Sequence, residues 1–173
     1  MRSICLAAIA ALALAGCRST HVENPVAFDA SEAGFIHKQG KATIDGHAFV
    51  TNKSGGAVNA AGQAVWLIPS TAYARQRFAA IYGARKSVPA IAIPTADSDP
   101  AYVEASRKTT SESGGKFSFD KVAPGDYFVV SQMTWRKDGQ LLPDGAAMYE
   151  TVKILGNETE PVKIVLAGNA SGT

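Results

Sequence analysis

From Lys41 onward, apolar and polar residues alternate with the period of two that is typical of β-strands. In "KATIDGHAFVTN", the apolar residues Ala42, Ile44, Ala48 and Val50 fall on one face. Further alternating or short apolar runs follow, separated by turn sequences rich in Gly, Asn, Asp, Ser and Pro. These runs predict strands at 64–69, 116–122, 125–135, 148–155 and 161–166.

The stretch "GGKFSFDKVAPGDYFVV" (114–130) predicts two strands joined by a corner. Phe117 and Phe119 point to one side, and Val122 joins them only if a bulge intervenes. Pro124 and Gly125 supply turn chemistry, because proline fixes φ and glycine tolerates positive φ. Along the second strand one face carries Tyr127, Val129, Met133 and Trp135. Short strands without helical crossovers predict a mainly β, antiparallel β-sandwich.

One segment breaks the strand pattern and predicts a single short helix inserted at about 70–83. Ser70 follows a proline and is placed to cap the helix, and Gly83 is placed to end it. The core-facing residues recur at helical spacing, and they are Ala74, Phe78, Ile81 and Tyr82.

Tyr73 and Arg77 lie four positions apart on the opposite arc of this helix. We therefore expect both side chains to be exposed and to form a partner-binding surface. The alternative is that Arg77 only solubilises the helix. The segment after the helix, 88–108, is a long loop punctuated by prolines, and it leaves room for one more short strand or turn.

The N-terminal residues 1–16 predict an export signal. A single cation, Arg2, precedes an apolar run from Ile4 to Ala15 that is too short to span a bilayer. The run ends in "LAGC", which resembles the lipobox of bacterial lipoproteins. This resemblance implies cleavage between Gly16 and Cys17 and a lipid on the Cys17 thiol. The alternative is an ordinary signal in which the cysteine occurs by chance.

The cysteine count agrees with lipidation. The chain holds two cysteines, and Cys5 would leave with the signal. The mature domain would then fold without disulfides, by core packing alone. Arg18 follows the cysteine, and by resemblance to enterobacterial lipoproteins this favours the outer membrane. Residues 17–40 are expected to form a lipidated flexible tether, unless its apolar residues dock on the domain; these are Val26, Phe28, Phe35 and Ile36.

Charge excludes one class of partner. The chain has 17 Lys and Arg against 15 Asp and Glu, and loss of Arg2 with the signal lowers the net charge from +2 to +1. A nucleic-acid-binding protein would carry a clustered excess of Lys and Arg. We therefore expect no binding of nucleic acid. The membrane would be reached through the lipid on Cys17.

The motif "GKFSFDKVAPGDY" resembles carboxypeptidase regulatory-like domains, which share a transthyretin-like β-sandwich. The matching positions are Gly115, Lys116, Phe117, Phe119, Val122, Pro124, Gly125 and Tyr127. The resemblance implies one such domain over residues 41–167, followed by a polar tail at 168–173. The shared residues set turns and core packing and bring no catalytic group with them.

No catalytic or metal-binding motif emerges from the sequence. His21, His37 and His47 lack the spacing of a zinc helix, and solvated surface positions are expected for them. Asp97 and Asp99 fall short of a calcium loop. Trp66 and Trp135 leave two alternatives open, namely ligand platforms and core packing. No cofactor is expected.

The leading hypothesis is therefore an envelope lipoprotein whose sandwich is a non-catalytic binding or structural module for an envelope protein or a glycan. A second hypothesis is a subunit of an envelope or secretion assembly, since type VI secretion uses a transthyretin-fold lipoprotein. A small envelope hydrolase is a third, and it would require polar groups that converge in a pocket.

Overall fold

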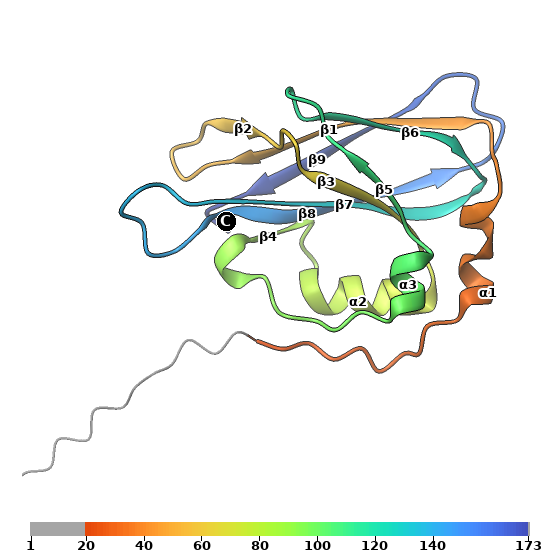
Figure 1. Cartoon of the computed structure of the whole chain (residues 1–173), viewed down its shortest axis with the longest axis horizontal. Helices are drawn as coiled ribbons and strands as arrows, with labels where there is room; N and C mark the ends of the chain where they lie inside the picture. The colour runs from red at the N-terminus through yellow and green to blue at the C-terminus, as the bar shows by residue number, and fades with distance from the viewer. Residues whose placement is uncertain (1–19, 173) are drawn as a thin grey trace, which may run out of the picture.

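Two β-sheets face each other in residues 20–172, the part of the chain that the computed structural model describes (Figure 1). The mainly β sandwich expected from the sequence is confirmed. The strands are β1 (Ala42–Thr51), β2 (Ala57–Asn59), β3 (Ala64–Pro69), β4 (Ser87–Pro89), β5 (Arg107–Thr110), β6 (Lys116–Val122), β7 (Gly125–Trp135), β8 (Asp144–Ile154) and β9 (Val162–Asn169). The helices are α1 (Ala30–Ala33), α2 (Ala72–Tyr82) and α3 (Pro100–Glu104), with 3-10 turns at Gly34–His37 and Ala90–Ala92.

The first sheet is built around β1. Strands β2 and β6 pair antiparallel with successive parts of one edge of β1, and β9 pairs with its other edge. The β9 pairing is parallel, in register from Ile44 opposite Val162 to Thr51 opposite Asn169. It is the exception to the antiparallel pairing expected here. The second sheet is antiparallel throughout, in the order β4-β8-β7-β3-β5.

The core between the sheets contains the residues that the alternation predicts. Ile44, Val50 and Val129 are fully buried there, and Phe117 and Phe119 pack with them. Val122 is also buried, and the expected bulge is present.

The bulge arises because Lys121 takes a positive φ of 50° and the β1–β6 register shifts between Ala42 and Ile44. The extra residue returns Val122 to the inner face.

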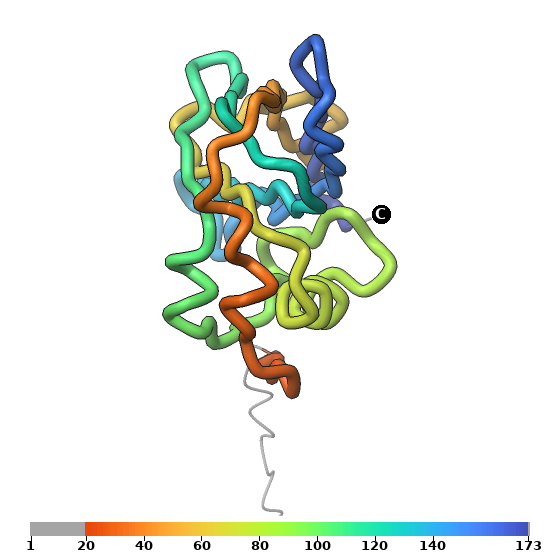
Figure 2. The backbone as a smooth tube through the Cα atoms, turned by 90° about the vertical axis from the view of Figure 1, so that its right-hand side faces the viewer, coloured from red at the N-terminus to blue at the C-terminus, as the bar shows by residue number. Residues whose placement is uncertain are grey.

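The second sheet is covered on both faces. Along β7, Tyr127 and Val129 enter the inter-sheet core, whereas Phe128 and Val130 face a second apolar cluster on the outer side. Helix α2 packs on that outer side, and Figure 2 shows it end-on beneath the sheets. Two-sided burial explains why these strands read as continuous apolar runs.

Residues 20–40 lie along the domain, which corrects the expectation of a free tether. Val26 and Phe28 pack against the outer cluster. Ile36 is buried in the inter-sheet core, and Phe35 meets the ring of Tyr127 with centroids 5.3 Å apart. Apolar residues in this segment therefore dock, which was the alternative considered. Gly16 and Cys17 lie outside the described residues.

The expected polar tail is also shorter than predicted. Strand β9 continues to Asn169, and Ala170 is buried in the core. Within residues 20–172, no helix has the length and apolar character needed to cross a bilayer.

Gly46 should be intolerant of a side chain. A Cβ there would lie 2.1 Å from Cζ of the buried Phe117 ring. We expect Gly46→Ala to lower the free energy of unfolding by about 1–3 kcal/mol, the usual cost of overpacking a core, measured by urea denaturation. Gly34 is the matched control, because a Cβ there meets nothing within 4 Å. Equal effects of the two substitutions would contradict this packing.

Candidate functional site

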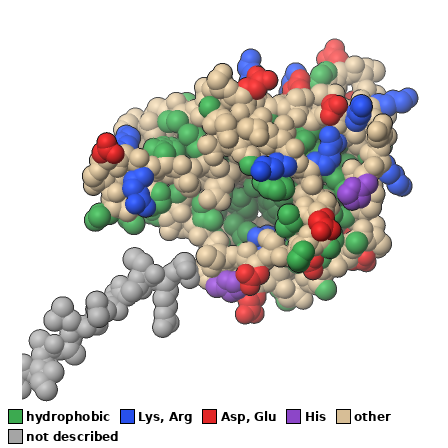
Figure 3. Space-filling view, viewed as in Figure 1, with side chains coloured by type: hydrophobic (Ala, Val, Ile, Leu, Met, Phe, Trp, Pro, Cys, Tyr) green, Lys and Arg blue, Asp and Glu red, His purple; other side chains and the backbone are tan. Residues whose placement is uncertain are grey.

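A groove of about 260 Å³ opens on the outer face of the second sheet, between α2 and α3. Figure 3 shows a hollow in this face of the molecule, with hydrophobic side chains gathered around it. We call it the aromatic groove. Its lining residues are Trp66, Ile68, Arg77, Phe78, Ile81, Tyr82, Ser98, Tyr102, Val103, Ser106 and Val130.

Helix α2 forms one wall of the aromatic groove, and local sequence sets its ends. The Thr71 side chain accepts a hydrogen bond from the Ala74 N–H, so the cap is one residue later than the predicted Ser70. Gly83 ends the helix with a φ of 59°, as expected. Phe78 anchors the helix by stacking on Phe128 of β7, with centroids 4.1 Å apart and planes 9° apart.

Helix α3 forms the opposite wall and positions Tyr102. The Asp99 side chain accepts from the Ala101 N–H and Pro100 occupies the first turn, so this short helix begins where its sequence favours it. The Tyr102 ring packs on Tyr73 of α2, with centroids 4.9 Å apart. Phe28 of the docked N-terminal segment also contacts the Tyr102 ring, with centroids 6.0 Å apart.

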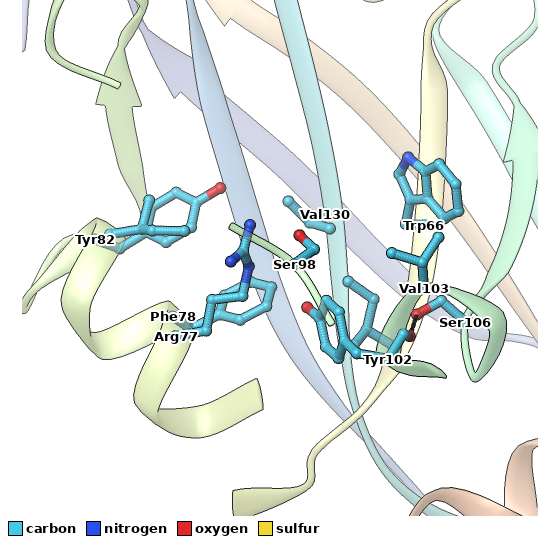
Figure 4. A pocket seen from close by; sticks show the side chains of 11 residues that line it. Trp66, Arg77, Phe78, Tyr82, Ser98, Tyr102, Val103, Ser106 and Val130 are labelled. Carbon is cyan, nitrogen blue, oxygen red and sulfur yellow. Dashed lines mark hydrogen bonds between the residues drawn. The ribbon is translucent and has the colours of Figure 1, made fainter. Parts of the chain in front are cut away.

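Arg77 ties the two walls together. Its guanidinium donates hydrogen bonds to the backbone carbonyls of Ala96 and Asp97, and it lies 5.8 Å from the centre of the Tyr102 ring. Figure 4 shows Arg77 on α2 and Tyr102 on α3 as neighbours among the side chains that line the groove. Arg77 is therefore half-buried and bonded, rather than a freely solvated charge.

The expected exposure of Tyr73 is wrong. Its side chain is only 6% exposed, and its hydroxyl accepts a hydrogen bond from the Asp99 N–H. The physical reason is a second layer over α2, since the N-terminal segment and α3 both cover the arc that the helix pattern assigns to solvent. Tyr73 and Arg77 are close to the same site, but Arg77 alone of the two lines the groove.

Trp66 lines the groove and also packs against the outer apolar cluster. It projects from β3 to the outer face, is half-buried and lines the groove, while Lys108 Nζ lies 5.2 Å from the centre of its ring. Trp135 instead packs against the inter-sheet core. The mostly apolar run "AVWLIP" does not show by itself which face Trp66 occupies. Because Val65 is buried in the inter-sheet core, the alternation along the strand places Trp66 on the outer face.

The tyrosines of the groove stay neutral well above physiological pH. Burial raises the pKa of Tyr102 to about 12, and the nearby Arg77 guanidinium offsets part of that rise. Burial also raises the pKa of Tyr82. Both hydroxyls are therefore available to donate as well as accept hydrogen bonds.

Among residues 20–172, those that line the groove include no Asp, Glu, His or Cys. Asp97 is fully exposed, 3.7 Å from His21, and Asp99 caps α3. Among the residues the structure describes, no group of three or more His, Cys, Asp or Glu is placed to hold a metal. The groove therefore offers aromatic surface, hydroxyls and one guanidinium, a set suited to binding a ligand.

Solved structures of other proteins resemble this chain. A crystal structure from Pseudomonas aeruginosa described as a "putative carbohydrate binding protein" has 27% sequence identity and a TM-score of 0.63, and the match covers 81% of this chain and 97% of that one. A 9R-lipoxygenase from Cyanothece matches at 10% identity and a TM-score of 0.27, over 83% of this chain and 17% of that one. No protein-family model and no curated protein sequence matches the chain.

Truncation of Tyr73 should reveal its burial. We expect Tyr73→Ala to lower the free energy of unfolding by about 3 kcal/mol or more, because it opens a cavity between α2, α3 and Phe28. Gln76→Ala, on the exposed side of the same helix, should stay within about 0.5 kcal/mol of the parent. Chemical denaturation of both variants checks this, and a neutral Tyr73→Ala would refute the packing described above.

Tyr102 should also make stability fall in alkali. Its pKa is raised on folding, so the unfolded chain loses its proton first, and the stabilisation is complete below about pH 10 and is lost as pH approaches about 12. The contribution is about 1.4 kcal/mol for each unit of pKa shift. Urea denaturation between pH 9 and 11 should show a shallower decline for Tyr102→Phe than for the parent. Parallel declines would contradict the assignment.

Proposed function

We propose that the protein is a non-catalytic glycan-binding module, held at a bacterial membrane by a lipid on Cys17. The observation that carries this proposal is the aromatic groove, where the Trp66 ring lies in one pocket with Arg77 and the hydroxyls of Tyr82 and Tyr102. A sugar presents apolar C–H faces and a rim of hydroxyls. Aromatic rings pack against the C–H faces, and a few polar groups form hydrogen bonds with the hydroxyls and so orient the sugar.

The charge of the groove favours an acidic sugar. Arg77 lines it and Lys108 lies over the Trp66 ring at its edge, while the lining itself has no carboxylate. A cationic side chain attracts a carboxylate through charge-assisted hydrogen bonds. Glycans that carry uronic acids are therefore the preferred ligands within this class.

The Pseudomonas aeruginosa structure supports the same function. It matches over most of both chains, and its description as a "putative carbohydrate binding protein" agrees with the chemistry of the groove. The same similarity favours binding over catalysis. Glycoside hydrolysis commonly uses two carboxyl groups on either side of the scissile bond, and the groove lining offers none.

The anchor rests on the sequence "LAGC" and on the cysteine count. Cleavage before Cys17 would leave that residue as the lipid-bearing N-terminus, and Arg18 favours the outer membrane by resemblance to enterobacterial lipoproteins. A module held at the envelope would meet envelope glycans at a high local concentration.

Tryptophan fluorescence tests the proposal directly, because the two tryptophans occupy different places. The Trp135→Phe variant retains only Trp66, and its emission should change saturably when acidic oligosaccharides are added. The Trp66→Phe variant retains only Trp135, which packs against the inter-sheet core away from the groove, and it should not respond. Arg77→Ala should weaken binding at least about tenfold, equivalent to about 1.4 kcal/mol.

Calorimetry with the parent protein provides the second readout. A panel of neutral, acidic and amino-sugar oligosaccharides that gives no saturable heat, together with unchanged Trp66 emission, would overturn the glycan proposal. Binding of neutral sugars alone would retain the function and remove the role given to Arg77 and Lys108.

A further inference from the structure

Large apolar side chains are exposed together at one end of the molecule. Leu141 is 91% exposed and Leu142 is 60% exposed, both in the loop between β7 and β8. Ile91, in the 3-10 turn Ala90–Ala92, is 58% exposed. In Figure 1 the β7–β8 loop projects at the left end of the molecule. The surfaces of soluble proteins rarely carry clusters of large apolar side chains unless these bind another protein, a ligand or a membrane.

Strand register brings these residues to the same end. Strand β4 pairs antiparallel with β8, with Val88 opposite Ala147 and Pro89 opposite Ala146. The chain continues from Pro89 directly into the turn that carries Ile91, while β8 runs back toward its first residue, Asp144. Ile91 therefore lies beside the base of the loop that carries the two leucines.

The start of the described chain is fixed to the same region. The Val22 N–H donates to the carbonyl of Thr95, and the Thr95 N–H donates to the carbonyl of Thr20, at 2.8 and 3.0 Å. Thr95 follows Ile91 by four residues. Cys17 precedes Thr20 by three residues, which span at most about 10 Å even when fully extended.

The charges of the loop suit an anionic surface. Arg136 and Lys137 precede the leucines and are exposed, against one exposed acid, Asp138. Asp144 at the base of the loop is paired with Lys53 at 2.7 Å, so it is neutralised locally. Basic and apolar side chains side by side are the features by which peripheral segments enter the headgroup region of a bilayer containing anionic lipids.

We infer that this end of the domain, formed by Ile91, Leu141 and Leu142 with Arg136 and Lys137, rests on the lipid surface. The inference depends on the proposed anchor at Cys17, whose short reach to the fixed Thr20 holds the domain against the membrane. The two leucines enter the interface, and the anchored domain takes one orientation. The aromatic groove, on the outer face of the second sheet, then keeps a fixed position relative to the bilayer.

A fluorescent probe at the loop tests the contact. The lipidated mature protein is purified from membranes as Leu141→Cys and labelled with an environment-sensitive thiol dye, since an acylated Cys17 thiol does not react. It is placed in vesicles of phosphatidylethanolamine and phosphatidylglycerol. Leu155→Cys is the matched control, because Leu155 is 65% exposed in the turn between β8 and β9 and lies outside the proposed surface.

We expect the probe at position 141 to brighten several-fold, shift to the blue and be quenched by lipids that carry a spin label near the headgroup. The probe at 155 should remain aqueous. Two aqueous probes on a protein whose mass shows a lipid at Cys17 would overturn the contact and leave the anchor standing. A blue shift at 141 without vesicles would identify self-association and overturn the lipid contact.

An unmodified Cys17 in the same mass spectrum would overturn the anchor, and with it the contact. The Leu141→Ser, Leu142→Ser double variant provides a further readout, because neither side chain is buried and folding should be unchanged. In vesicles this variant should expose the β7–β8 loop to protease, whereas the parent should resist cleavage there. Equal cleavage of the two proteins would count against the contact.

Discussion

The stack of Phe78 on Phe128 is the contact on which the outer layer of the molecule depends. It fixes helix α2 to the outer face of a sheet whose inner face already forms the core, so β7 is buried on both sides. An uncovered outer face would expose Ile68, Phe128 and Ala147 to water. The helix covers part of this face, and the remainder, between α2 and α3, is the aromatic groove.

The N-terminal segment completes that arrangement. Phe28 contacts both Tyr73 and Tyr102, and the Asn24 side chain donates to the carbonyl of Tyr73. One wall of the groove is thus supported by residues that precede the sandwich in the chain. Contacts with Phe28, Tyr73 and Arg77 hold the ring of Tyr102 in place. A rigid wall lowers the entropy lost when a ligand binds.

Sequence reasoning succeeded where a residue's surroundings depend on its own strand or helix. The faces of β1, β6 and β7, the bulge before Val122 and the end of α2 at Gly83 all follow from local periodicity and turn chemistry. It failed for Tyr73, because helical periodicity detects one buried face and α2 has a second cover. It left the role of Trp66 undecided, since a groove arises from segments that are distant in sequence. The parallel pairing of β1 with β9 was not predicted either, because those two strands are also far apart in the chain.

The parallel pair has a consequence for the order of assembly. The first strand of the sandwich needs the last one to satisfy its second edge, across a separation of 118 residues between Asp45 and Lys163. Until β9 is available, β1 has an open edge and the inter-sheet core lacks the buried Leu166. Contacts this distant form late, because closing the loop costs entropy before any pairing compensates. A chain exported from its N-terminus would therefore remain unfolded, and able to pass through a narrow channel, until almost its whole length had crossed.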